Sequence, residues 1–180
     1  MFDTDVRQSH REAMPYGEYL ALGETMHYEY YDGELHMNPP SRRHVVIARR
    51  LTRLLEDAAP ATCEVLPEFG WRMKAGYDFE PDIMVSERGA PGPDLLRVAP
   101  LLVVEVTSPS TKGDDWGRKM ALYAEGGLLW YWVVEPDVDT LTVLHNDGGS
   151  FQVVRRIEGG TVTLSEPFAI ELDTASIFAA

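Results

Sequence analysis

The alternation of apolar and polar positions divides the N-terminal third of the chain into short elements of two kinds. Residues 15–22 predict a short helix that begins at Pro15 and ends at Gly23. The period then changes to that of a strand over residues 26–31 and 34–37. These two runs flank Asp32-Gly33, a dipeptide typical of tight turns between strands, so the stretch predicts a β-hairpin.

A longer amphipathic helix is predicted from Ser41 to the residues before Pro60. Its apolar positions recur at helical spacing, and most of its arginines fall elsewhere around the helix. The apolar set is Val45, Val46, Ala48, Leu51, Leu54 and Leu55, and the basic set is Arg42, Arg43, Arg49, Arg50 and Arg53. The basic set can form a local binding surface for a nucleic acid, or it can be a helix face that only contacts solvent. The second case is the commoner one.

The middle of the chain predicts an α/β fold. Short strands are expected at residues 63–66, 70–73 and 82–86, followed by a loop rich in Gly and Pro over residues 89–93. Residues 101–107 and 128–134 are apolar on both faces, which is typical of strands covered by helices. Between them, Asp114 or Asp115 is expected to cap a helix that ends at Gly126-Gly127 and carries on one face Trp116, Met120, Tyr123 and Ala124.

The C-terminal part predicts an antiparallel β meander after Pro136. Residues 140–145, 151–157 and 161–164 alternate in polarity, and glycine-containing turns separate them. Together these elements predict a central mixed sheet flanked by helices, with the meander near the C-terminus.

Composition fits one domain over residues 1–180, with a polar and loose tail over residues 1–14. The 180 residues are 44% hydrophobic and 25% charged, which is ordinary for a globular protein. The net charge of −13 argues against an open basic surface for non-specific nucleic-acid binding, so any such contact has to be local.

Cys63 is the single cysteine, which excludes an intramolecular disulfide and fits a reduced compartment. No leader or run of membrane-span length is apparent, and we expect a cytoplasmic protein.

Two carboxylates stand where a metal site can form. Glu105 lies inside the most apolar run, where an ionised carboxylate is unfavourable unless a cation or good hydrogen bonds compensate it. Asp82 follows Pro81 at the mouth of another strand. Neighbouring strands can bring Asp82 and Glu105 to the same end of a sheet, which suits a hard cation such as magnesium or manganese. Lys119, fourteen residues after Glu105, can position a nucleophile or offset charge that grows on a phosphate.

Each candidate also has a structural alternative. Asp82 can simply cap a turn, and Glu105 can form a buried ion pair with Lys119 without any metal. His44 on the arginine-rich helix fits a surface residue, whereas Lys112, Asp114 and Asp115 fit loop and cap residues. No serine-hydrolase elbow, phosphate-binding loop, dinucleotide glycine pattern or zinc-protease helix is present in the sequence.

Five segments of the chain, between about residues 17 and 143, resemble the Uma-two family of restriction endonuclease-like proteins, within the PD-(D/E)xK nuclease superfamily. They are Tyr31-Asp32-Gly33-Glu34-Leu35, Pro81-Asp82-Ile83, Val103-Val104-Glu105-Val106-Thr107-Ser108-Pro109-Ser110-Thr111, Lys119-Met120-Ala121-Leu122-Tyr123 and Tyr131-Trp132-Val133-Val134-Glu135-Pro136. The resemblance implies a restriction-endonuclease-like core and a magnesium- or manganese-dependent endonuclease whose substrate is DNA. It also implies metal ligands at Asp82 and Glu105, an added acid at Glu34 and a possible homodimer.

The chain departs from the superfamily pattern at Thr107, where a lysine usually stands two positions after the second acid. A lysine that has moved to the next helix, Lys119, would restore the charge. The alternative is a catalytically inactive nuclease-fold protein for binding or assembly, which the acidic composition and the aromatic Trp130-Tyr131-Trp132 also fit.

Overall fold

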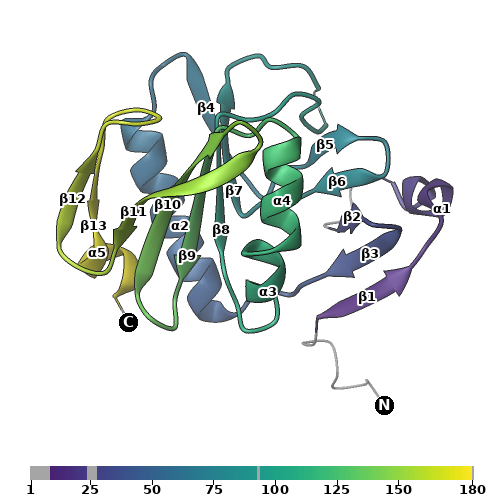
Figure 1. The fold of residues 1–180 in the computed structure, drawn as a ribbon, viewed down its shortest axis with the longest axis horizontal. Coiled ribbons are helices and arrows are strands. Elements are labelled where there is room, and N and C mark those ends of the chain that lie inside the picture. Colours follow the sequence, from purple (N-terminus) through teal and green to yellow (C-terminus); the bar gives the residue numbers. More distant parts are fainter. Residues whose placement is uncertain (1–8, 24–27, 93, 180) are drawn as a thin grey trace.

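A six-stranded mixed sheet forms the centre of the molecule. The structure is a computed structural model that describes residues 9–23, 28–92 and 94–179. The strand order is β11-β10-β9-β8-β7-β4, in which β8 and β9 are parallel and the other neighbouring pairs are antiparallel (Figure 1). The strands are β4 (Cys63–Pro67), β7 (Ile83–Glu87), β8 (Leu102–Val106), β9 (Trp130–Glu135), β10 (Thr140–Asp147) and β11 (Ser150–Ile157). The predicted α/β class with a central mixed sheet is confirmed.

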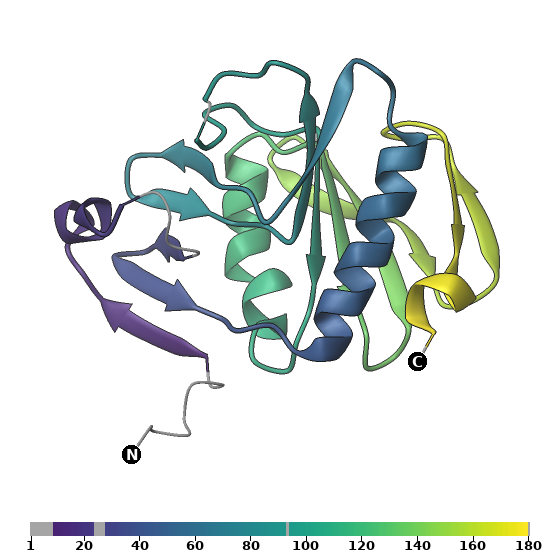
Figure 2. The same ribbon diagram turned by 180° about the vertical axis from the view of Figure 1, so that it is seen from behind.

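Helices cover both faces of this sheet, as the apolar runs predicted. Helix α2 (Arg42–Ala58) lies on one face and α4 (Arg118–Glu125) on the other (Figures 1 and 2). Because side chains alternate along a strand, Val104 of β8 joins the core with α2, whereas Val103 joins the core with α4. The two buried faces therefore fix the register of β7 and β8, the strands that carry the candidate acids.

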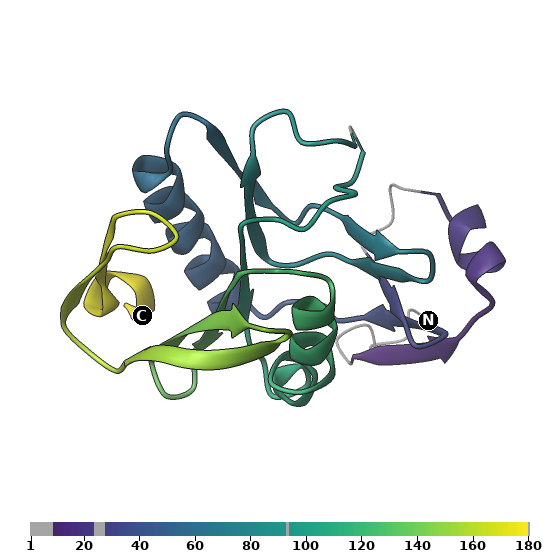
Figure 3. The same ribbon diagram turned by 45° about the horizontal axis from the view of Figure 1, so that its top comes forward.

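A smaller five-stranded sheet lies beside the central one, with the order β1-β3-β2-β6-β5 (Figure 3). It contains the predicted hairpin, since β2 (Glu29–Tyr31) and β3 (Glu34–Met37) pair across Asp32-Gly33, although residues 26 and 27 lie outside the described residues. Its remaining strands are β1 (His10–Ala13), β5 (Trp71–Lys74) and β6 (Tyr77–Phe79), and the short helix α1 (Tyr16–Ala21) follows β1.

The structure corrects one expectation in this region and adds one strand that was not predicted. Residues 10–13 do not form a loose tail, because they pair with β3 from His10↔Met37 to Ala13↔Glu34. Strand β6 was not predicted, because it is only three residues long and pairs with β5 across a tight turn at Gly76, whose φ of 81° suits glycine.

The helix expected to begin at Asp114 or Asp115 is interrupted. Two helices, α3 (Lys112–Asp115) and α4, meet at Gly117, whose φ of −123° and ψ of −95° are not helical. A Cβ atom at this position would lie 2.6 Å from the carbonyl oxygen of Gly113, so the close turn requires glycine. Asp115 is consequently buried inside α3 and does not cap α4.

The predicted meander is wrong in its third strand. Strand β12 (Thr161–Leu164) leaves the central sheet and pairs with β13 (Ile170–Asp173), and α5 (Thr174–Phe178) follows. Burial explains the departure, since Leu164, Ile170 and Leu172 join the apolar core beneath α2.

Over the described ranges, no helix combines the length and the apolar character that crossing a membrane demands.

Candidate active site

A cleft of about 650 Å³ opens between the central sheet, the β2–β3 hairpin and the first turn of α2. We call it the acidic cleft, because six carboxylate side chains line it. They are Glu29, Glu68, Glu80, Asp82, Glu105 and Asp115. The same cleft is lined by Lys119, by His44 and by the uncharged residues Asn38, Ser108 and Thr111.

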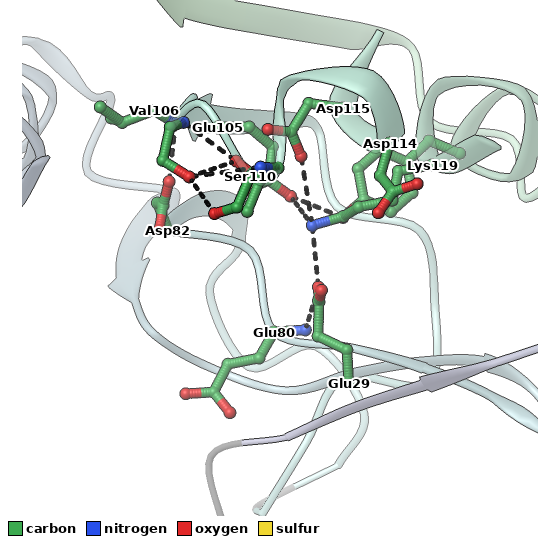
Figure 4. Close-up of polar contacts among 12 residues, drawn as sticks. Glu29, Glu80, Asp82, Glu105, Val106, Ser110, Asp114, Asp115 and Lys119 are labelled. Atoms are coloured by element: carbon green, nitrogen blue, oxygen red, sulfur yellow. Dashed lines mark hydrogen bonds and ion pairs between the residues drawn. The ribbon is translucent and has the colours of Figure 1, made fainter. Parts of the chain in front are cut away.

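The register of β7 against β8 brings Asp82 and Glu105 together. Ile83 pairs with Val104, so Asp82, which precedes β7, stands next to Glu105 near the end of β8 (Figure 4). Asp82 Oδ2 accepts a hydrogen bond of 2.6 Å from the backbone N–H of Val106. This bond anchors the Asp82 carboxylate to the end of the neighbouring strand.

His44 holds the other oxygen of the Asp82 carboxylate. Its Nε2 lies 2.8 Å from Asp82 Oδ1. Ser41 caps α2 by accepting a hydrogen bond from the His44 backbone N–H, so the imidazole is fixed in the first helical turn. Burial opposes a charge on His44, but the hydrogen bond and the negative charge of Asp82 outweigh it and raise the pKa of His44.

Glu105 is 4% exposed and depends on two donors. Its Oε1 accepts a hydrogen bond of 2.7 Å from the Tyr123 hydroxyl and forms an ion pair with Lys119 Nζ, 2.7 Å away. Burial raises the pKa of Glu105 well above its usual value, the Lys119 charge opposes the rise, and Asp82 and Asp115 add to it. The ionised form of Glu105 is therefore unfavourable in this place unless cations and donors compensate it.

Lys119 is a single buried ammonium that faces three carboxylates (Figure 4). Besides Glu105, its Nζ lies 2.9 Å from Glu29 Oε1 and 3.8 Å from Asp115 Oδ1. Burial opposes the charge on Lys119, and these acids raise its pKa well above the usual value. Burial nevertheless raises the pKa of Asp115 to about 6, although Lys119 opposes the rise. One lysine among six carboxylates leaves the acidic cleft with surplus negative charge.

The donor set fits a hard divalent cation. Among the described residues, no group of three His, Cys, Asp or Glu side chains is arranged to hold a metal ion by itself. Magnesium does not require such a group, since it is commonly bound by one or two carboxylates together with water and substrate phosphates. Asp82 and Glu105 supply two adjacent carboxylates, and the surplus negative charge around them favours a cation.

Glu34, the expected additional acid, is not among the described residues that line the acidic cleft. Its side chain is 43% exposed, and its Oε2 lies 3.9 Å from His36 Nε2. On the same hairpin, Glu29 reaches Lys119, and its Oε1 also accepts a hydrogen bond of 3.2 Å from the backbone N–H of Glu80 (Figure 4). Reasoning from the sequence missed Glu29. It lies two residues before the inward-facing Tyr31 on the same strand, so both side chains share one face, and this spacing was a usable signal.

Two residues set aside as surface or cap positions also lie in the cleft. His44 precedes the buried Ile47 by three residues, and Asp115 precedes Lys119 by four, so helical spacing connected each of them to an inward-facing neighbour.

Thr107, which stands where a lysine is usual in the superfamily, donates its backbone N–H to the Val134 carbonyl. The buried cation beside Glu105 comes from Lys119 on α4.

A family model and a solved structure agree on a nuclease fold, and a sequence relative matches most of the chain. The sequence model of the Uma2 family, described as "Putative restriction endonuclease", matches residues 16–175. "Uncharacterized protein slr1290" of Synechocystis sp. (strain PCC 6803) is 31% identical over 170 residues, which cover 86% of this chain and 88% of that protein. A crystal structure from Anabaena variabilis ATCC 29413, described as "a putative nuclease belonging to DUF820", superposes with a TM-score of 0.74 at 19% identity, and covers 92% of this chain and 98% of that chain. This last likeness supports the fold alone.

Proposed function

The chain belongs to the Uma2 family, and from this membership and the acidic cleft we propose that it is a metal-dependent endonuclease that hydrolyses phosphodiester bonds in DNA. The observation that carries the proposal is the adjacency of Asp82 and Glu105 at the ends of β7 and β8, with Lys119 Nζ 2.7 Å from Glu105 Oε1. The carboxylates at the strand ends are rigid, because both strands lie in the middle of the central sheet.

Asp82 and Glu105 would hold magnesium or manganese. When bound, such an ion polarises a phosphodiester oxygen and lowers the pKa of a water molecule. Val106 and His44 hold the Asp82 carboxylate from two sides, so its orientation is set before any ligand arrives. The Tyr123 hydroxyl similarly holds one oxygen of Glu105.

Lys119 would orient the attacking water or offset charge that grows on the phosphate. Its Nζ is held between Glu29 and Glu105, so the ammonium can serve this purpose without the side chain rearranging. Glu34 would contribute only from outside the cleft, through His36, and we assign the inner carboxylate of the hairpin to Glu29.

The second candidate is a nuclease-fold protein that binds or assembles without cleaving. The ion pair between Lys119 and Glu105 favours it, because a buried acid that is already compensated by an ammonium does not need a metal. The two candidates differ in one measurable property, which is the affinity of the protein for a divalent cation.

Calorimetric titration with manganese tests the proposal without knowledge of the DNA sequence. We expect one binding event in the parent, its loss in Asp82→Asn and Glu105→Gln, and its retention in Asp147→Asn, which alters an exposed acid at the end of β10. We also expect the parent, and not Asp82→Asn, to cleave plasmid DNA. Cleavage retained in Asp82→Asn would refute the site assignment, and absence of manganese binding in the parent would favour the second candidate. Sedimentation of the parent tests the proposed homodimer.

A further inference from the structure

Three arginines form a stripe along the outward face of α2. Arg42, Arg49 and Arg53 are exposed and follow one another at intervals of seven and four residues, which places them on one side of the helix. The buried residues Ile47 and Leu51 face the central sheet from the opposite side. We call these three residues the arginine stripe.

The arginine stripe carries positive charge that the protein does not neutralise. The neighbours on the same helix are engaged, since Arg43 pairs with Asp139 and Arg50 donates to the carbonyls of Ile177 and Ala179. Within the part of the chain that the structure describes, the basic side chains with neither an ion pair nor a hydrogen bond are Arg42, Arg49, Arg53, Arg97 and Arg155. Three of these five share one helix face, although the chain has 29 acidic and only 16 basic residues.

The stripe begins in the helical turn that carries His44 of the acidic cleft, on the other side of that turn. Arg42 lies in the first turn of α2 with His44, which lines the cleft, and Figure 2 shows α2 in front of the sheet with this end next to the chain that comes from β3. Arg53 lies eleven positions after Arg42, so the stripe is about 16 Å long at 1.5 Å per residue. Double-stranded DNA carries about one charge per 1.7 Å of its axis, so a stripe of this length can face several phosphates.

The acidic cleft itself repels a phosphate backbone, because its carboxylates outnumber its cations. Affinity for DNA then has to come from positive charge outside the cleft, close enough for the same duplex to touch both. The arginine stripe supplies such charge, and its first member lies in the same helical turn as His44 of the cleft. We propose that it binds the phosphate backbone of double-stranded DNA that enters the acidic cleft, an inference that rests on the proposed nuclease function.

The salt dependence of DNA binding tests this inference with a matched pair of variants. Arg49→Gln/Arg53→Gln removes two charges of the stripe that lie away from the cleft, and Arg97→Gln/Arg155→Gln removes two exposed and unpaired charges elsewhere. Both variants have the same net charge. The probe is a random-sequence DNA duplex with calcium in place of magnesium, and fluorescence anisotropy gives the dissociation constant at several salt concentrations.

The slope of log Kd against log salt concentration counts phosphate contacts. Each contact contributes about 0.9 to the slope, so we expect the slope of the stripe variant to be lower than that of the parent by about 2. The slope of the control variant should differ from that of the parent by less than about 1. Equal slopes in the two variants would overturn the inference and leave the nuclease proposal to the plasmid assay. Absence of DNA binding by the parent would overturn both.

Discussion

Asp115→Asn should make the protein more stable at neutral pH, because burial makes the ionised Asp115 carboxylate unfavourable and Lys119 compensates it only in part. The Asp115 side chain is buried, and its nearest cation, Lys119 Nζ, is 3.8 Å away. Burial raises its pKa from the usual 3.8 to about 6. The difference is about two, and each pKa unit corresponds to about 1.4 kcal/mol, so ionising Asp115 in the folded protein costs about 3 kcal/mol.

The sign of the pH dependence follows from proton uptake. Between about pH 4 and pH 6 the folded protein keeps a proton on Asp115 that the unfolded chain has lost. The free energy of unfolding therefore falls as the pH rises through this window and stays lower above it. Asparagine resembles the protonated aspartate, so the variant should match the parent near pH 4 and exceed its stability by about 3 kcal/mol above pH 7.

Urea denaturation of the parent and of Asp115→Asn from pH 4 to pH 8 measures this difference directly. Asp114→Asn is the control, because Asp114 pairs with Arg11 and belongs to the same helix but does not line the cleft. We expect no gain of stability from the control at pH 8. A difference between Asp115→Asn and the parent that does not change with pH would refute the reasoning that ionising the buried Asp115 lowers the stability. Millimolar manganese should narrow the difference if the cleft binds the ion.

Two further substitutions test the contacts around the candidate ligands. Lys119→Met should lower the free energy of unfolding by about 3–5 kcal/mol, because buried carboxylates lose their cation, and adding Glu105→Gln should recover part of the loss in urea denaturation. Recovery by an exposed change such as Glu158→Gln would contradict that explanation. His44→Gln should weaken manganese binding by about tenfold or more in calorimetry, because Asp82 loses one of its two positioning contacts. Unchanged manganese affinity would show that Val106 alone orients Asp82.

The sequence predicted the elements that are long or strongly periodic. Helix α2 and strands β8 and β9 were located correctly, because burial on one face or on both leaves a clear period in the sequence. Strand β1 is exposed along its whole length and therefore has no apolar alternation to detect. The pairing of β12 with β13 depends on packing beneath α2, which local pattern does not encode.

The candidate site was predictable only in part. Asp82 and Glu105 were found because each carboxylate lies at or inside an apolar run that becomes a central strand. Glu29, His44 and Asp115 were missed or set aside, because a polar residue in a hairpin or in a first helical turn is usually exposed. They became candidates only when the tertiary structure brought the hairpin, α2 and α3 around one cleft.

The one parallel pair of the sheet has a consequence for the order of assembly during folding. Strand β8, helices α3 and α4, and strand β9 follow one another in the chain, and this crossover contains Glu105, Asp115, Lys119 and Tyr123. Only short loops have to close for Lys119 to meet Glu105, whereas Glu29 comes from a hairpin 90 residues before Lys119. We therefore expect Lys119 and Glu105 to be paired before the hairpin docks. Glu29 would then complete the cleft by packing against an ammonium that is already buried.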